Sequence, residues 1–366
     1  MTDYKKLEEF YKGKRVFLTG HTGFKGSWMC MVLNMLGAEV YGYSLKPNTD
    51  PALYDILGID LHIHSYIGDI RDYSTLSKAY VEADPEIVIH MAAQPIVRDS
   101  YKDPAYTYET NVMGTVNILE CLRNHPGAVS FLNVTTDKVY ENSDKPDHAF
   151  KEDEKLDGYD PYSNSKSCSE LITHSYRQSF FNVGERQKCG DRPVVPAIST
   201  ARAGNVIGGG DYATDRIIPD CVRATVKGES IVVRNPYSTR PYQHVLEPTR
   251  AYLMIAMAQA FDNSVADSYN IGPDREDCIN TGKVADLFVD NWGNDASWKN
   301  VGEVNAPHEA AFLMLDNSKA ANQLGIRPKW HTDKAIAKTV EWYKAYNEGG
   351  DMYSYTISQI SDYLDE

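Results

Sequence analysis

The sequence predicts an α/β protein built on a doubly wound parallel sheet, with a smaller C-terminal lobe interleaved with that sheet. Short, almost continuously apolar segments alternate with segments whose apolar residues recur at helical spacing. Strands that are apolar on both faces are typical of parallel sheets covered by helices on both sides. Because crossovers between parallel strands are right-handed, the expected sheet is of the Rossmann type.

The first half of the chain supplies most of this sheet. The expected strands are residues 15–20, 38–45, 63–70, 85–93 and 128–136. Residues 24–37 form an expected helix that ends at Gly37, and residues 103–125 carry apolar side chains at helical spacing between the last two strands. Strands and helices that alternate in this way predict βαβ units.

The second half is less regular. Residues 192–211 predict one more strand that runs into a glycine-rich loop. Further expected elements are short strands at residues 230–235 and 268–273 and helices near residues 280–292 and 332–347. The sequence shows no internal repeat and no low-complexity linker, which favours a lobe interleaved with the sheet over two separate units.

The composition of the chain indicates which partners and which cellular compartment to expect. The 366-residue chain has a formal net charge of −14, and nucleic acids and anionic membranes prefer basic surfaces, so neither is an expected partner. A small phosphorylated ligand needs only a few local cations. The N-terminal segment lacks the apolar core of a secretory signal, and no apolar run is long enough to span a membrane. The six cysteines are scattered without metal-ligand spacing, so we expect a cytoplasmic protein with reduced thiols and no metal site.

The stretch FLTGHTGFKGSW, residues 17–28, places Gly20, Gly23 and Gly26 three residues apart. Glycines in such a turn let backbone amides approach a pyrophosphate at a helix N-terminus. The alternative is a tight strand-to-helix turn without a ligand. Because the motif lies between the first strand and the first helix, we favour a dinucleotide site. Further cofactor contacts are expected from His21, Phe24, Lys25, Ile70, Ala92 and Ala93.

The identity of the dinucleotide stays open at this point. An acidic residue at the end of the second strand usually binds the adenosine ribose of NAD, and the sequence YGYSLKPNTD has none directly after that strand. Lys25 and Lys46 are instead placed to reach a phosphate, so we expect NAD without excluding NADP. Asp69, which ends the third strand, is either an adenine contact or a helix N-cap.

A candidate catalytic group combines a later helix with the end of the fifth strand. In DPYSNSKSCSEL, Tyr162 and Lys166 lie four residues apart and project from one helix face. The phenol of tyrosine, with an ordinary pKa of about 10, is a poor base at neutral pH. A neighbouring ammonium and a positive nicotinamide ring are expected to lower the pKa of Tyr162. The strand end NVTTDKVYEN adds Thr136, Asp137 and Lys138 at the edge where doubly wound sheets bind ligands.

These predictions divide the chain into two regions with different expected functions. We expect residues 1–191 to form the dinucleotide-binding domain, completed by segments near residues 236–262. Residues 192–366 are expected to form mostly the substrate-binding lobe. The aromatic-rich tail DMYSYTISQISDYL has no function that the sequence reveals.

Eight stretches follow one another in a consistent order from about residue 15 to residue 316. They are VFLTGHTGFKGSW, HMAAQPIVRDSY, NVMGTVNILE, TTDKVYEN, YSNSK, ARAGNVIGGGD, RPYQHVLEP and HEAAFLMLD. Together they resemble the extended short-chain dehydrogenase/reductase superfamily and, within it, the CDP-glucose 4,6-dehydratases. The similar dehydratases of dTDP-glucose and GDP-mannose usually carry Asp-Glu or Ser-Glu where this chain has Asp137-Lys138.

The resemblance implies a reaction without net redox change. Tyr162 would take the proton of the glucose C4 hydroxyl while hydride passes to NAD, with Thr136 hydrogen-bonded to the substrate. Asp137 would protonate the departing C6 hydroxyl, and Lys138 would be the base at C5 or, as an ammonium, a stabiliser of the C4 enolate oxygen. Hydride return to C6 would give a 4-keto-6-deoxy sugar nucleotide, so the reduced cofactor has to be held between the two transfers.

The resemblance also implies how the nucleotide sugar is held. Residues around its pyrophosphate, where a bidentate guanidinium suits phosphate, would be Asn205, Arg216, Arg234 and Arg240. Gln94 and Arg98 would line the hexose site, and Asn111 is expected to tie a helix to the sheet. The alternatives are solvated arginines and, for the residues after the fourth strand, loop structure.

Rival functions fit parts of the sequence. A sugar-nucleotide 4-epimerase needs no acid or base at C5 and C6, so Asp137-Lys138 argues against it. A dehydratase for another nucleotide sugar is a closer alternative, and a non-catalytic dinucleotide sensor is disfavoured by Tyr162 and Lys166. The resemblance further implies a homodimer or higher homo-oligomer and a part in deoxysugar and lipopolysaccharide O-antigen synthesis.

Overall fold

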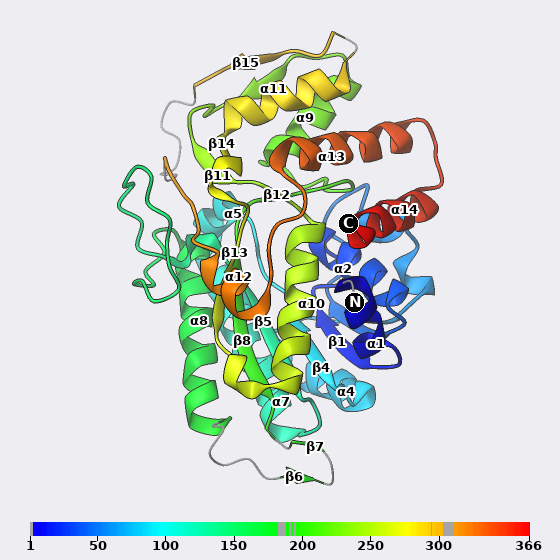
Figure 1. Ribbon diagram of the computed structural model, residues 1–366, viewed down its shortest axis with the longest axis vertical. Coiled ribbons are helices and arrows are strands. Elements are labelled where there is room, and N and C mark those ends of the chain that lie inside the picture. The colour runs from blue at the N-terminus through cyan, green and yellow to red at the C-terminus, as the bar shows by residue number, and fades with distance from the viewer. Residues whose placement is uncertain (1–2, 182–187, 190–191, 194, 294, 303–310) are drawn as a thin grey trace.

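A parallel sheet of seven strands forms the centre of the protein in the part of the chain that the structure describes (Figure 1). This computed structural model describes residues 3–181, 188–189, 192–193, 195–293, 295–302 and 311–366. In spatial order the strands are β13 (Ser268–Ile271), β8 (Ala197–Ala203), β5 (Ser130–Thr136), β4 (Ile87–His90), β1 (Arg15–Thr19), β2 (Glu39–Ser44) and β3 (His64–Ile67). Neighbouring strands of this sheet pair in parallel. The fold class predicted from the sequence is confirmed.

Helices cover both faces of the sheet (Figure 1). One face carries α4 (Tyr73–Ala83), α7 (Gly114–Asn124) and α8 (Pro161–Phe180), and the other carries α2 (Phe24–Met35) and α10 (Leu246–Phe261). Successive side chains of a strand point to opposite faces. Phe17 therefore packs in the apolar cluster under α4 and α7, while its neighbour Leu18 packs in the cluster under α2 and α10. Burial on both faces explains why the strands read as continuous apolar runs.

The order of the strands reverses between β1 and β4. From β1 the chain adds β2 and β3 on one side, and from β4 it adds β5, β8 and β13 on the other. Doubly wound sheets bind ligands beyond the carboxyl ends of their strands at such a reversal. The turns that follow β1 and β4 meet there, because Gly20 lies against the backbone of Ala92.

A lobe from the second half of the chain lies at one end of the sheet (Figure 1). It contains β10 (Ile231–Val233) paired with β15 (Trp298–Asn300), β11 (Thr239–Pro241) paired with β14 (Cys278–Asn280), and α9 (Ile217–Val226), α11 (Thr281–Trp292) and α13 (Thr332–Asn347). The expected strand at residues 230–235 is β10 of this lobe, whereas the expected strand at residues 268–273 is β13 of the central sheet. The predicted boundary after residue 191 lies outside the described residues, as do residues 308–310 of the HEAAFLMLD stretch.

The continuous helix expected over residues 103–125 is interrupted. α6 (Pro104–Tyr108), capped by Asp103, is followed by a π-helical turn, η2 (Glu109–Met113), before α7 begins. Apolar spacing alone does not reveal such a turn, because a π-turn inserts only a small change of phase. The remaining described elements are α3 (Leu53–Ile56), η1 (Ile59–Leu61), α5 (Val97–Lys102), η3 (Asp137–Val139), β6 (Lys188–Cys189), β7 (Arg192–Pro193), β9 (Val206–Ile207), β12 (Gln243–His244), η5 (Asn263–Val265), η6 (Arg275–Asp277) and α12 (Ser318–Leu324).

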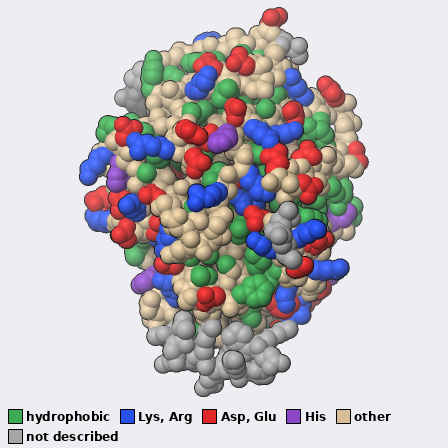
Figure 2. All heavy atoms as spheres, viewed as in Figure 1, with side chains coloured by type: hydrophobic (Ala, Val, Ile, Leu, Met, Phe, Trp, Pro, Cys, Tyr) green, Lys and Arg blue, Asp and Glu red, His purple; other side chains and the backbone are tan. Residues whose placement is uncertain are grey.

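The surface carries charges of both signs. On the face drawn in Figure 2, acidic and basic side chains are intermixed. None of the helices in the described ranges combines the length and the apolar character needed to cross a membrane.

The first and last helices, α1 (Asp3–Tyr11) and α14 (Met352–Asp365), lie near each other against α2 and α10 (Figure 1). Tyr363 of α14 is fully buried, and its hydroxyl donates to Glu247 Oε2 at 2.8 Å and accepts from Arg250 Nε at 3.0 Å. Arg250 also donates to Asp3 Oδ2 at 2.9 Å. The aromatic tail, whose role the sequence did not reveal, therefore packs on the chain's own core and joins both ends of the chain to α10.

We expect Tyr363→Phe to lower the free energy of unfolding by about 1–3 kcal/mol, because the buried Arg250 and Glu247 side chains each lose a hydrogen-bond partner. Urea unfolding measures the change. Tyr353→Phe is the matched control, since this partly exposed ring of the same helix stacks on His62. Unchanged stability of the Tyr363 variant would show that the network does not hold the tail.

Candidate active site

A cavity of about 1310 Å³ lies between the turns at the strand ends and the lobe. Ordinary ligand pockets measure roughly 300–1,000 Å³, so this cavity has room for a dinucleotide together with a second ligand. Every cofactor, substrate or catalytic residue predicted from the sequence lines it, apart from His21 and Asp137. The structure therefore brings together residues that lie up to about 220 positions apart in the sequence.

The glycine-rich turn fits a dinucleotide phosphate. Gly20 has a φ of +81°, and a Cβ there would lie 2.8 Å from the backbone nitrogen of Ala92. A Cβ at Gly26 would lie 2.1 Å from the carbonyl oxygen of Gly20, so neither position has room for a side chain. Gly23 precedes the first residue of α2, Phe24, and the helix N-terminus borders the cavity. Unpaired amides at a helix N-terminus attract anions, which supports the cofactor prediction.

His21 points away from the cavity. Its ring packs where a Cβ of Gly42 would be, only 2.4 Å from the ring, and its Nε2 forms a 2.8 Å hydrogen bond with Ser65 Oγ. Burial lowers the pKa of His21 to about 4. The imidazole is thus neutral and supports the turn from beneath, and Gly42 is the residue whose lack of a side chain makes room for it.

The end of β3 shows two aspartates with different tasks. Asp72 caps α4 by accepting from the Thr75 backbone nitrogen at 3.1 Å, so the N-cap alternative for Asp69 is wrong. Asp69 lines the cavity and accepts from Arg71 Nη2 at 2.7 Å, and its hydrogen bonds with Arg71 lower the pKa of Asp69. Ser44, the last residue of β2, lines the cavity, and so does Lys46, which was expected to reach a phosphate.

Helix α8 begins at Pro161, directly after a capping residue in the sequence. Asp160 caps the helix by accepting from the Ser163 backbone nitrogen at 3.0 Å, and Pro161 occupies the first turn. Tyr162 and Lys166 then face the cavity from adjacent turns. Lys166 Nζ donates to the carbonyl oxygen of Val134 at 3.1 Å, which ties the helix to β5.

The titration of this pair is set mainly by burial. Burial lowers the pKa of Lys166 to about 8, against the opposing effect of Glu170. Burial also raises the pKa of Tyr162 to about 12, although a hydrogen bond with Thr136 acts in the other direction. Burial thus acts against the lowering of the Tyr162 pKa that we expect from the Lys166 ammonium and a nicotinamide ring together.

The turn η3, directly after β5, holds the other candidate pair. Lys138 Nζ lines the cavity and donates to Asp137 Oδ1 at 2.8 Å and to Asn205 Oδ1 at 3.2 Å. Asp137 is fully buried beneath it, and Thr136 Oγ1 donates to the same Asp137 oxygen at 3.0 Å. The second carboxylate oxygen, Oδ2, is buried and finds no hydrogen-bond partner among the described residues. Asp137 therefore does not line the cavity itself and is connected to it through its contact with Lys138.

Carboxylates accompany the predicted arginines of the lobe. Arg216 Nη1 donates to Asp211 Oδ2 at 2.9 Å, and Arg234 Nη1 donates to Asp215 Oδ1 at 2.7 Å. Arg98 Nε, from the other side of the cavity, lies 3.9 Å from the same Asp215 oxygen. The arginines thus border the cavity, as the pyrophosphate prediction requires, and they are held by acids that the sequence reasoning missed.

The side chains of Gln94 and Asn111 serve the loop after β4. Gln94 Nε2 donates to Thr107 Oγ1 at 3.0 Å, and its Oε1 accepts from the Ile96 backbone nitrogen at 2.5 Å. Asn111 accepts from the Gln94 backbone nitrogen at 2.8 Å and donates to Ser165 Oγ at 2.8 Å. The loop-structure alternative describes what the Gln94 amide does here, and Asn111 ties the π-turn to this loop and to α8.

Lys25, an expected cofactor contact, also lines the cavity. It rises from the first turn of α2 toward Tyr252, with 3.5 Å between Nζ and the phenol oxygen. Burial, together with the positive charges of Arg216 and Lys166, lowers the pKa of Lys25 to about 7. The centre of the cavity is therefore cationic, in a protein whose net charge is −14.

Comparisons with known proteins agree with this geometry. The profile of the GDP-mannose 4,6 dehydratase family matches residues 17–339. The chain is 45% identical over 358 residues, 98% of both chains, to the CDP-glucose 4,6-dehydratase of Salmonella typhimurium. It is 25% identical to the dTDP-glucose 4,6-dehydratase of Shigella flexneri over 90% of this chain and 93% of that one.

Solved structures share the fold. The UDP-glucose 4-epimerase of Thermotoga maritima superposes with a TM-score of 0.76 at 22% identity, covering 91% of this chain and 99% of that chain. The dTDP-glucose 4,6-dehydratase of Bacillus anthracis in complex with NAD gives a TM-score of 0.73 at 21% identity, covering 93% and 99%. The matches over nearly the full length confirm the resemblance seen in the motifs. The chain belongs to the sugar-nucleotide 4,6-dehydratase family of the extended short-chain dehydrogenase/reductases.

Proposed function

We propose that this protein dehydrates CDP-glucose to CDP-4-keto-6-deoxyglucose with NAD as its cofactor. The observation that carries the reaction type is that Lys138, paired with the buried Asp137, lines the same cavity as Tyr162 and Lys166. The cytidine nucleotide is supported by the 45% identity to the Salmonella enzyme. NAD is supported by relatives solved with NAD and by the room that Gly20 and Gly26 leave for a phosphate.

The first step is the oxidation of C4. When bound, NAD would supply the acceptor for the C4 hydride and the source of the hydride that C6 receives. Tyr162 takes the proton of the C4 hydroxyl, and the ammonium of Lys166, held by the carbonyl of Val134, stabilises the phenolate. Burial in the cavity excludes water and strengthens this electrostatic effect.

The second step is elimination across C5 and C6. The 2.8 Å contact between Lys138 Nζ and Asp137 Oδ1 lets one proton move from the ammonium to the carboxylate. That transfer creates both groups the step needs, a neutral amine to take the C5 proton and a neutral acid to protonate the C6 hydroxyl as it leaves as water. Elimination then leaves Lys138 as an ammonium and Asp137 as a carboxylate, so the ion pair is restored.

Proton return closes the cycle. Lys138 gives its proton back to C5 when the hydride reaches C6. After that step Lys138 is a neutral amine, and Tyr162 still holds the proton from the C4 hydroxyl. Thr136 hydrogen-bonds to both Tyr162 and Asp137, so its hydroxyl can pass this proton to Asp137, which passes it on to Lys138 across their 2.8 Å contact. Each group thereby regains its starting state, and the net products are the keto sugar and one water.

We also propose that the enzyme is a cytoplasmic homo-oligomer that serves deoxysugar synthesis for lipopolysaccharide O-antigen. Leu171 and Phe180 of α8 expose about half of their surface, which supports an assembly through this helix. The free, buried thiols of Cys30 and Cys221 support a reducing compartment.

The proposed function is tested by supplying NAD and one nucleotide sugar at a time: CDP-glucose, dTDP-glucose, UDP-glucose or GDP-mannose. We expect CDP-glucose to lose one water and give a 4-keto product, as read by mass spectrometry and NMR. Turnover of only one of the other nucleotide sugars would show that the enzyme prefers a different nucleotide base. Formation of an epimer of unchanged mass would overturn the dehydratase assignment. Binding of NAD without any turnover would favour the dinucleotide sensor.

Tyr162→Phe removes the group that takes the C4 proton, and we expect it to slow C4 oxidation by about 10²–10⁴-fold. The measurement is the single-turnover appearance of reduced cofactor by absorbance. Tyr108→Phe is the matched control, because its hydroxyl donates to Asn164 at the start of the same helix. Equal rates for the Tyr162 variant and the wild type would assign the base elsewhere.

Lys138→Met keeps the aliphatic stem but removes the amine, and we expect it to oxidise C4 and then stop before water is lost. Reduced cofactor and a 4-keto sugar that retains its C6 hydroxyl would accumulate, with product formation slowed by about 10²-fold or more. Rapid quench and mass spectrometry separate the two species. Full dehydration at the wild-type rate would remove Lys138 from the mechanism.

A further inference from the structure

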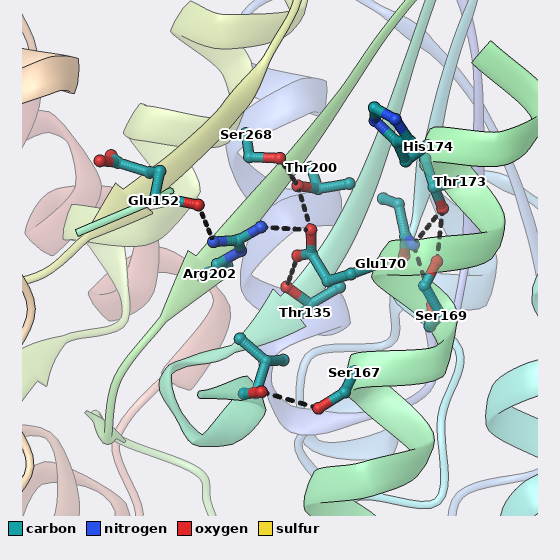
Figure 3. A network of polar contacts seen from close by, with 12 residues as sticks. Thr135, Glu152, Ser167, Ser169, Glu170, Thr173, His174, Thr200, Arg202 and Ser268 are labelled. Atoms are coloured by element: carbon teal, nitrogen blue, oxygen red, sulfur yellow. Dashed lines mark hydrogen bonds and ion pairs between the residues drawn. The ribbon is translucent and has the colours of Figure 1, made fainter. Parts of the chain in front are cut away.

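A buried polar network lies directly behind the active site (Figure 3). Glu170, one turn of α8 beyond Lys166, is 2% exposed. Its carboxylate accepts from Thr135 Oγ1 at 2.5 Å and from Thr200 Oγ1 at 2.7 Å. It also pairs with Arg202 Nη2 at 2.9 Å. Figure 3 shows Glu170 reaching from the helix toward these three residues of β5 and β8.

Arg202 extends the network to Tyr140, the residue that follows the turn η3 with Asp137 and Lys138. Its Nη1 donates to the phenol oxygen of Tyr140 at 2.8 Å and to the carbonyl oxygen of Glu152 at 2.9 Å. Tyr140 in turn donates to Asn270 Oδ1 at 2.7 Å, and its ring stacks on Phe150 with 4.9 Å between the ring centroids. The phenol and the ring of Tyr140 are therefore both held in place.

Thr135 and Tyr140 bracket the turn that carries Asp137 and Lys138. The 3₁₀ turn η3 has only three residues and little stability of its own, so its position depends on what holds its ends. One end is tied to Glu170 through Thr135, and the other is tied to Arg202 through Tyr140. Both ties converge on a single buried ion pair.

Stability alone is a weak reason for this pair. Taking two charges out of water costs about as much as their attraction returns, and apolar replacements of similar volume are often as stable. Arg202 Nε is moreover buried, and it finds no hydrogen-bond partner within the described ranges. Glu170 and Arg202 also do not line the cavity, so neither touches a ligand there.

We infer that the Glu170–Arg202 pair is a positioning device for the elimination step: it holds both ends of the Asp137–Lys138 turn in register with the sugar that Tyr162 has oxidised. The inference rests on the proposed function. Tyr162 comes from α8 and Lys138 comes from the end of β5, so the two steps need two elements aligned on one hexose. A displacement of about 1 Å costs on the order of 10²-fold in rate, and a loose turn therefore penalises elimination before it affects C4 oxidation.

Two conservative variants test the device without breaking the ion pair. Thr135→Val removes the tie at one end of the turn, and Tyr140→Phe removes the tie at the other and keeps the stacked ring. In each variant we expect loss of water to slow by about 10-fold or more while C4 oxidation changes by less than about 3-fold. Single-turnover absorbance and rapid-quench mass spectrometry measure the two steps.

Hydrogen exchange supplies a readout that needs no substrate and no cofactor. In both variants we expect the backbone amides of residues 136–140 to exchange at least about 10-fold faster than in the wild type, because the turn is released. Thr173→Val is the control: this buried threonine of α8 accepts from Asn133 Nδ2 at 2.8 Å and does not contact the turn (Figure 3). It is expected to leave both the ratio of the steps and the exchange of residues 136–140 unchanged.

The results separate this inference from the proposed function. Equal slowing of both steps, or unchanged exchange of residues 136–140 in both tie variants, would overturn the positioning role. If the wild type does not dehydrate CDP-glucose, the proposed function fails, and the exchange experiment alone decides whether the pair holds the turn. A faster exchange confined to residues 136–140 supports the holding, and a change equal to that of Thr173→Val contradicts it.

Discussion

The contact between helix α8 and the end of strand β5 is the interaction on which this active site depends. Lys166 donates to the carbonyl of Val134, Glu170 accepts from Thr135, and Ser167 Oγ donates to the carbonyl of Val139 at 2.7 Å. Each bond joins one turn of the helix to one position of the strand or of the turn that follows it. Tyr162 of one element and Lys138 of another therefore meet at one cavity, and a shift of the helix would separate the groups proposed for the two steps.

The charge of the cavity follows from the same burial. The protein is strongly acidic overall, yet Lys25, Lys138, Lys166 and Arg216 border one space. Burial lowers the pKa of Lys25 to about 7 and that of Lys166 to about 8, and the positive charges of Arg216 and Lys166 add to the effect on Lys25. An anionic ligand would relieve this repulsion, so the proposed binding of phosphates does not require a basic surface. The same burial raises the pKa of Tyr162 to about 12.

The sequence predicted the sheet well because burial on both faces leaves continuous apolar runs that are hard to mistake. Nearly all the site residues that it identified line the cavity, because turns at the carboxyl ends of parallel strands have to meet. It could not place what depends on side-chain direction. His21 lies in the glycine-rich turn but points beneath it, and the choice between Asp69 and Asp72 as the cap of α4 is decided by a difference of three residues. Glu170 and Arg202 were missed because a lone acid and a lone arginine, about thirty residues apart, carry no pattern until two strands and a helix bring them together.

The central claim is that one held cofactor carries a hydride from C4 to C6 while the Asp137–Lys138 pair removes water between the two transfers. Its most direct test mixes two substrates. One is CDP-glucose that carries deuterium at C4, and the other is CDP-glucose that carries ¹³C in the sugar ring and no deuterium. The account predicts a 4-keto-6-deoxy product with deuterium at C6, found only in molecules without ¹³C. Deuterium at C6 of ¹³C-labelled molecules, or a product that keeps deuterium at C4, would contradict it.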